Sequence, residues 1–214
     1  MGDIKTIGIL GAGRVGTAIA RRAVAAGYDV RIATAKPASE LEMLVSFVAP
    51  GAKAASAGDL IALSDVVILA LPLSKYKTLQ PDLFAGKIVI DAMNYWAPTD
   101  GSLPEFETGR TSSEVVAAHL HSARIVRSFN HMGYHEIDGE ARGAGDPERR
   151  ALAVAGDDPL ARRAVAEFVD RIGFDPVDAG ALAAGRQFDI GTPVFGAPLN
   201  QESMRQALAL PLAA

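Results

Sequence analysis

The chain has 214 residues, of which 49% are hydrophobic, and a formal net charge of −4, the balance of an ordinary globular protein. This acidity argues against nucleic acid as the main partner, and the absence of cysteine excludes disulfides, thiolate catalysis and cysteine-ligated zinc. No apolar run approaches the roughly 20 residues that cross a bilayer, and the amino terminus lacks the regions of a signal peptide. We therefore expect a cytoplasmic protein with no membrane partner.

Short apolar runs alternate with helical patterns along the first half of the chain. The runs at 65–72 and 87–93 are apolar almost throughout, as in strands that a parallel sheet buries on both faces. Strands that alternate with helices indicate right-handed βαβ units and a doubly wound α/β fold. The expected strands are 6–11, 29–34, 53–56, 65–72 and 87–93, and the expected helices are 14–27 and 39–48, the latter with a capping box of Ser39 and Glu42.

The pattern loosens beyond Met93. Residues 94–112 indicate a long polar loop, and residues 138–150 a solvated loop at a domain boundary. We expect a dinucleotide-binding domain at 1–140 and a small carboxy-terminal α/β lobe at 141–214. The remaining expected elements are helices at 112–123 and 159–173, strands at 124–130, 151–157 and 175–180, and a short helical pattern near 200–209.

The string GAGRVG at 11–16 fits the G-x-G-x-x-G fingerprint of dinucleotide-binding proteins. It follows a predicted strand and opens a predicted helix, which is the context that gives the fingerprint its meaning. Gly11 would allow the tight turn, Gly13 the approach of a pyrophosphate, and Gly16 close packing of helix against strand in a Rossmann-type sheet. The alternative is a structural turn without a ligand. The predicted phosphate contacts, at the positive end of the helix dipole, are Gly11, Ala12, Gly13, Arg14, Val15 and Gly16.

The end of the second predicted strand lacks the acidic residue that reads the adenosine ribose in NAD enzymes. No acid lies between Val30 and Ser39, and Asp29 comes too early in the strand. Thr34 can donate to a phosphate oxygen, and Lys36 can place its charge beside it. We therefore expect NADP(H) as the ligand, the alternative being that Lys36 is a solvated loop residue.

Two further strand ends are expected to border the nicotinamide. The segment ALPLS at 70–74 ends a strand with Pro72, which would turn the backbone over the nicotinamide ribose. Asn94 follows the next strand, where its amide could bond the ribose or the carboxamide. Each residue also has a structural alternative, since Pro72 can end a strand and Asn94 can form a turn.

The chain resembles the family of coenzyme F420-dependent NADP reductases, whose relatives include the NADP-binding domain of the membrane ferric reductases. The resemblance spans roughly residues 6 to 190 with the same order and comparable spacing of segments. IVRSFNH and DAGALAAGR discriminate better than the dinucleotide motifs, which many dehydrogenases share. The segments are GILGAGRVGTAIARRAVAAGYDV, TAK, VVILALP, IDAMN, IVRSFNH and DAGALAAGR.

The resemblance implies a role for several residues and leaves the electron acceptor open. Ala35 stands where the family often has a second basic residue, and the ending GTPVFGAPLNQESMRQALALPLAA departs from the apolar helix of archaeal members. The acceptor could therefore be deazaflavin, flavin, quinone or iron. The implied contacts are Ala12 to Gly16 for the phosphates, Thr34 and Lys36 for the 2′-phosphate, Leu71 and Pro72 for the nicotinamide, and Asn130, His131 and residues 181–186 for the deazaflavin.

No catalytic acid or base is assigned, because hydride transfer between two rings needs orientation and a dry cleft. The histidines do not favour a metal site. His119 and His121 point apart on a predicted helix, and Gly133 argues against a helix that would bring His131 and His135 together. His131 can hydrogen-bond a ligand carbonyl or be structural.

Two other functions compete with this one. Reductases of small imines, carbonyls or 3-hydroxy acids usually have a long helical carboxy-terminal domain with a catalytic lysine, but here no lysine follows Lys87 and only about 40 residues follow Gly173. An NADP-binding redox sensor would hold NADPH without consuming it. We also expect a homodimer, because Val194, Phe195 and Leu199 need cover.

Overall fold

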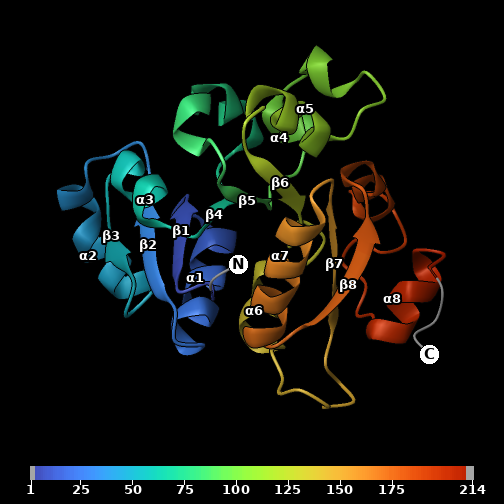
Figure 1. Cartoon of the computed structure of the whole chain (residues 1–214). Coiled ribbons are helices and arrows are strands. Elements are labelled where there is room, and N and C mark those ends of the chain that lie inside the picture. Colours follow the sequence, from blue (N-terminus) through green and yellow to red (C-terminus); the bar gives the residue numbers. More distant parts are fainter. Residues whose placement is uncertain (1–2, 211–214) are drawn as a thin grey trace.

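The computed structural model describes residues 3–210, which form one eight-stranded sheet with helices on both faces (Figure 1). The strand order is β3-β2-β1-β4-β5-β6-β7-β8, and every neighbouring pair is parallel except β6 and β7. The order from β3 to β6 is that of a doubly wound dinucleotide-binding sheet. The strands are β1 (Thr6–Leu10), β2 (Asp29–Ala33), β3 (Lys53–Ala54), β4 (Val66–Leu69), β5 (Ile88–Asp91), β6 (Arg124–Arg127), β7 (Ala151–Gly156) and β8 (Asp175–Gly180).

The helices connect these strands and pack against the sheet. None of the helices within residues 3–210 is both long enough and apolar enough to cross a membrane. The α-helices are α1 (Arg14–Ala25), α2 (Ala38–Val48), α3 (Ala57–Leu63), α4 (Ala97–Asp100), α5 (Ser112–His119), α6 (Tyr134–Gly139), α7 (Pro159–Arg171) and α8 (Gln201–Ala207). The 3₁₀ helices are η1 (Leu73–Thr78), η2 (Pro81–Phe84), η3 (Pro104–Phe106) and η4 (Leu182–Phe188).

The central strands are apolar throughout because both of their faces are covered. Ile68 and Ile90 enter a core that includes α1 and α7, whereas Val67 and Val89 point the other way, into a core with α3 and α5. Alternation along a strand directs successive side chains to opposite faces, so both sets must be apolar. The predicted α/β class and the expected strands of the first half are confirmed.

The predicted cap of the second helix is wrong. α2 begins at Ala38 with Pro37 as its N-cap, and no side chain caps it, so Ser39 lies within the first turn. Proline fixes its own φ near the value that a helix start requires. The helix therefore begins one residue closer to the amino terminus than predicted, at Ala38 instead of residue 39. The capping box of the chain stands instead at Thr111 and Glu114, at the start of α5.

Two segments expected to be irregular contain helices. Gly133, the residue that argued against a helix, is the N-cap of α6 and precedes its first turn. α6 takes up the first residues of the expected loop 138–150, and that loop ends on Arg149 and Arg150, whose side chains are buried against Asp170, Asp175 and Glu140. The expected polar loop 94–112 likewise contains α4 and η3.

The carboxy-terminal strands extend the same sheet. β7 pairs antiparallel with β6, and α7 returns the chain so that β8 lies parallel to β7 (Figure 1). The sheet is therefore continuous across the expected boundary at residue 140, and the division into two domains stays a prediction about their separate roles.

The apolar residues behind the expected homodimer lie largely within their own chain. Val194 is buried against α8 and β7, Leu199 packs partly on the same cluster, and Phe195 is 36% exposed. The homodimer stays a prediction. Of the three residues on which it rests, Phe195 is the one with a substantial exposed surface.

Candidate functional site

The carboxyl ends of five neighbouring strands lie in one row at one edge of the sheet. Since these strands are parallel, the segments that follow them also meet at this edge, which is where open α/β sheets bind ligands. This arrangement brings together the glycine loop, Thr34, Leu71, Asn94 and the segment after β6. The register pairs across the row are Leu10 with Ala33, Leu10 with Leu69, Leu69 with Asp91, and Asp91 with Arg127.

The glycine loop is tightly packed at two of its three glycines. Gly11 has a φ of 125° and donates its N–H to Ala33 O at 2.9 Å. A Cβ on Gly11 would lie 2.2 Å from Ala70 O, and one on Gly16 would lie 2.2 Å from Gly11 O. Both positions therefore exclude any side chain, because the atoms that a Cβ would meet are backbone atoms that cannot move aside.

The third glycine faces open space. A Cβ on Gly13 would meet no atom within 4 Å. Gly13 is the N-cap of α1, no side chain caps this helix, and its first turn holds no acidic residue. The N–H groups of Arg14, Val15 and Gly16 have no partner within the helix, so the positive end of a 12-residue helix faces this open surface. The geometry suits a phosphate group.

Thr34 and Lys36 lie directly after β2, beside the glycine loop. The Lys36 N–H donates to Thr34 Oγ1 at 3.1 Å, which leaves the threonine hydroxyl hydrogen free to donate elsewhere. The Lys36 side chain is exposed, and no carboxylate in the described part of the chain pairs with it. Asp29 lies at the opposite end of β2, where the hydrogen bond from Lys53 keeps the Asp29 pKa below its usual value.

A cavity of about 250 Å³ connects the glycine loop to the ends of β5 and β6. We name it the Val15 cavity, after the residue that the glycine loop contributes. Asn94, Asn130, His131 and Tyr134 also line it, so it brings together predicted residues from distant segments. Leu71 is half-buried and Pro72 is exposed; neither lines this cavity, and Pro72 is the N-cap of η1.

Asn94 and Asn130 are bonded to each other and to their surroundings. Asn94 Nδ2 donates to Asn130 O at 2.7 Å, and its Oδ1 accepts from Arg127 at 3.1 Å. Asn130 is buried and donates through Nδ2 to Phe188 O at 3.0 Å. Asn94 keeps one amide hydrogen for a ligand, because each amide nitrogen carries two.

His131 is buried with both ring nitrogens engaged. Nε2 accepts the Ala153 N–H at 3.1 Å, so the proton resides on Nδ1, which donates to Asn130 Oδ1 at 3.2 Å. Burial, together with the positive charges of Arg127 and Arg150, lowers the His131 pKa to about 3. His131 is therefore neutral near pH 7 and positions Asn130.

We expect His131 to make the fold less stable in mild acid. Its pKa rises from about 3 in the folded state to its ordinary value in the unfolded state, so the stabilisation is present above about pH 6.5 and is lost as the pH falls toward 3. Between pH 7 and 5 the wild type should lose about 2 kcal/mol of unfolding free energy more than His131→Gln, which does not titrate. Urea denaturation at both pH values measures this, and equal losses would contradict it.

An ionic network beneath the site was not foreseen from the sequence. Arg127 is 1% exposed; its NH1 donates to Met93 O and lies 3.3 Å from Asp91 Oδ2, and its NH2 donates to Asn94 and Asp189. It thereby ties β5, β6 and the segment after η4 together. The available signal was Arg127 between the apolar residues Ile125–Val126 and Phe129, since a buried charge requires a partner.

Phe129 is a second feature that sequence reasoning missed. It is fully buried and has a φ of 66°, in the left-handed region that a bulky side chain rarely adopts. Such strain costs on the order of 1–3 kcal/mol and occurs often at functional sites. Phe129 lines the Val15 cavity, and its conformation directs the chain from β6 into the segment that carries Asn130.

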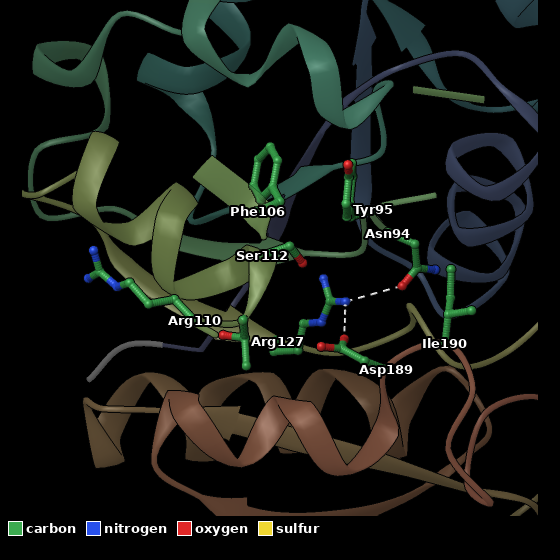
Figure 2. Close-up of a pocket in the computed structure, with 9 residues that line it drawn as sticks. Asn94, Tyr95, Phe106, Arg110, Ser112, Arg127, Asp189 and Ile190 are labelled. Atoms are coloured by element: carbon green, nitrogen blue, oxygen red, sulfur yellow. Dashed lines mark hydrogen bonds and ion pairs between the residues drawn. The ribbon is translucent and has the colours of Figure 1, made fainter. Parts of the chain in front are cut away.

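A second cavity, of about 140 Å³, lies beyond Asn94 (Figure 2). We name it the Tyr95 cavity. Tyr95 and Phe106 form an aromatic wall, with ring centroids 5.2 Å apart and planes inclined by 29°. The remaining lining comes from the start of α5 and from Asn94, Arg127, Asp189 and Ile190. Asn94 therefore lines both cavities.

Comparison with known proteins gives a consistent picture. The family described as NADP oxidoreductase, coenzyme F420-dependent, matches residues 6–95. A hypothetical protein from Sinorhizobium meliloti is 30% identical over 92% of this chain and 96% of its own, with a TM-score of 0.80. A protein from Arthrobacter sp. FB24, proposed to be an F420-dependent NADP reductase, is 24% identical over 86% of this chain and 87% of its own, with a TM-score of 0.72.

A longer relative matches most of this chain. Metalloreductase STEAP3 of Rattus norvegicus is 26% identical over 185 residues, which are 86% of this chain and 35% of the rat protein. This chain thus spans about a third of that relative. Together with the glycine loop and the sheet order, these matches show that the chain belongs to the coenzyme F420-dependent NADP oxidoreductase family, a family of NADP-dependent oxidoreductases.

Proposed function

We propose that the protein binds NADP(H) and transfers a hydride between it and a deazaflavin of the coenzyme F420 type, or a flavin. One observation carries the proposal: the open amino end of α1 at Gly13 lies beside a free hydroxyl and a free ammonium group, those of Thr34 and Lys36. The open end of α1 suits a diphosphate, and the Thr34 hydroxyl and Lys36 ammonium group together suit an additional phosphate on the adenosine ribose. Membership of the family supports the same ligand.

The residues of the chain would bind and orient the two substrates. The glycine loop would hold the diphosphate, Leu71 and Pro72 would border the nicotinamide ribose, and the free amide hydrogen of Asn94 would face the nicotinamide in the Val15 cavity. NADPH supplies the hydride and becomes NADP⁺, and the acceptor gains that hydride and a proton from solvent. We assign NADP binding to residues 1–140 and the far wall of the cleft to residues 141–214.

Lys36→Asp should weaken the binding of NADPH far more than that of NADH. The variant removes a charge-assisted contact and places a carboxylate beside the 2′-phosphate, so the Kd for NADPH should rise about 100-fold or more, and that for NADH less than threefold. Titration calorimetry with both nucleotides measures this. Lys5→Asp, with the same change of charge at the other edge of the sheet, is the control. Equal losses of both nucleotides would remove Lys36 as the phosphate reader.

The acceptor is tested by following NADPH absorbance with several acceptors present. A deazaflavin or a flavin should consume NADPH in the presence of the protein, whereas ferric citrate and a cyclic imine should not. NADPH that binds tightly but is left unconsumed whichever acceptor is added would indicate a redox sensor. Consumption with ferric citrate alone would indicate a metalloreductase, as the rat relative is named.

A further inference from the structure

The Tyr95 cavity contains polar groups that have no partner within the described residues. Asp189 uses Oδ1 to accept from Arg127, whereas its Oδ2 accepts no hydrogen bond there. The Ser112 hydroxyl at the start of α5 is directed toward the cavity and likewise has no partner within the described residues (Figure 2). The Asp189 side chain is 28% exposed, so both groups can be reached from the cavity and offer it an acceptor and a donor that the described residues do not use.

The unpaired groups form a specific combination. Asp189 Oδ2 is an acceptor and the Ser112 hydroxyl is a donor; both residues line the same cavity, whose wall is the flat Tyr95–Phe106 pair. The complementary ligand is a planar ring with an N–H beside a carbonyl group. A cyclic imide has this edge, because its nitrogen donates while its two oxygens accept.

The cavity is placed to present such a ring to the nicotinamide. Asn94 lines both cavities, and the Val15 cavity on its other side adjoins the glycine loop. A tricyclic acceptor anchored by one end in the small Tyr95 cavity would extend past Asn94 toward the nucleotide. The volume of about 140 Å³ suits one ring of such an acceptor.

We propose that the Tyr95 cavity reads the imide edge of the electron acceptor, with Asp189 accepting its N–H and Ser112 donating to a carbonyl. This inference rests on the proposed function and sharpens it, because it selects among acceptors. Flavins and deazaflavins carry a ring imide N–H. Quinones offer carbonyl oxygens without that donor, and a hydrated ferric ion fits neither the aromatic wall nor the donors.

The experiment compares riboflavin with 3-methylriboflavin, and 5-deazariboflavin with its N3-methyl derivative, as acceptors at saturating NADPH. The methyl group removes the N–H and leaves the reacting end of the ring unchanged. The KM should be about tenfold or more higher for each methylated acceptor, the usual effect of losing a hydrogen bond to a charged group. The KM for NADPH should not change.

Variants of Asp189 and Ser112 test whether these residues cause the preference for acceptors with an imide N–H. Asp189→Asn directs an amide N–H where the carboxylate oxygen was, so its KM for riboflavin should approach its KM for 3-methylriboflavin. Ser112→Ala should raise the KM about equally for both acceptors, because the serine bonds a carbonyl that both possess. Asp82→Asn, at an exposed carboxylate of η2, is the matched control and should retain the wild-type preference.

The outcomes separate this inference from the function beneath it. If the wild type had the same KM for each acceptor and for its N3-methyl derivative, the inference would be overturned and the proposed function would stand. A preference that Asp189→Asn leaves intact, in a variant that melts as the wild type does, would also overturn it. Failure of all four acceptors to oxidise NADPH would remove the proposed function and the inference together.

Discussion

Gly13→Val is expected to abolish NADPH binding without unfolding the protein. A side chain at this position meets no protein atom within 4 Å, and its backbone, with φ −78° and ψ −177°, is extended and open to valine. The valine would instead occupy the space through which a diphosphate approaches the N–H groups of α1. Losing even two such charge-assisted bonds should raise the NADPH Kd about 100-fold or more.

Gly16→Ala is the matched comparison, because the same loop there has no room. Its Cβ would lie 2.2 Å from Gly11 O, so α1 must move away from β1, and the unfolding free energy should fall by about 3 kcal/mol or more. Thermal denaturation should leave Gly13→Val within about 1 kcal/mol of the wild type. Calorimetry with NADPH completes the test. If Gly13→Val bound NADPH normally, the glycine loop would not be the diphosphate site.

The parts of this fold that sequence reasoning anticipated are those determined by local patterns. The strands ending at Leu69 and Asp91 are visible because both faces of each strand must be apolar. The glycine loop is visible because its spacing is tied to one strand–turn–helix unit. The start of α2 was misplaced by one residue, because Pro37 and Ser39 both favour a helix start and the proline prevailed.

The parts that sequence reasoning missed depend on residues far apart in the chain. Asp91 and Arg127 are 36 positions apart, and Asp189 is a further 62 away, in a stretch with little regular pattern. Their pairing follows from the register of β5 with β6 and from the return of the chain through η4. One sequence reveals that Arg127 is a charge within an apolar run but not which carboxylates it meets.

Removal of Arg127 should therefore cost more stability than most single substitutions. Arg127→Met keeps the length of the side chain but leaves Asp91, which is 0% exposed, without its cationic partner. Breaking a buried ion pair on one side typically costs about 3–5 kcal/mol, because the remaining carboxylate stays buried and charged. Urea denaturation at pH 7 measures the loss. A loss below about 1 kcal/mol would show that the network contributes little to the fold.

The double variant Arg127→Met/Asp91→Asn distinguishes the ion pair from the packing. Met93 N and Ser113 Oγ lie 3.0 Å and 2.6 Å from different oxygens of the Asp91 carboxylate. The asparagine oxygen can still accept the Met93 N–H, and its NH2 group can donate to the Ser113 hydroxyl oxygen, but the side chain carries no charge. Stability should therefore recover by about 1–3 kcal/mol relative to Arg127→Met, a coupling typical of residues in direct contact. NADPH binding should weaken in both variants, because Asn94 loses the donor that fixes its amide. Binding unchanged in a folded variant would mean that Arg127 supports the sheet and not the orientation of Asn94.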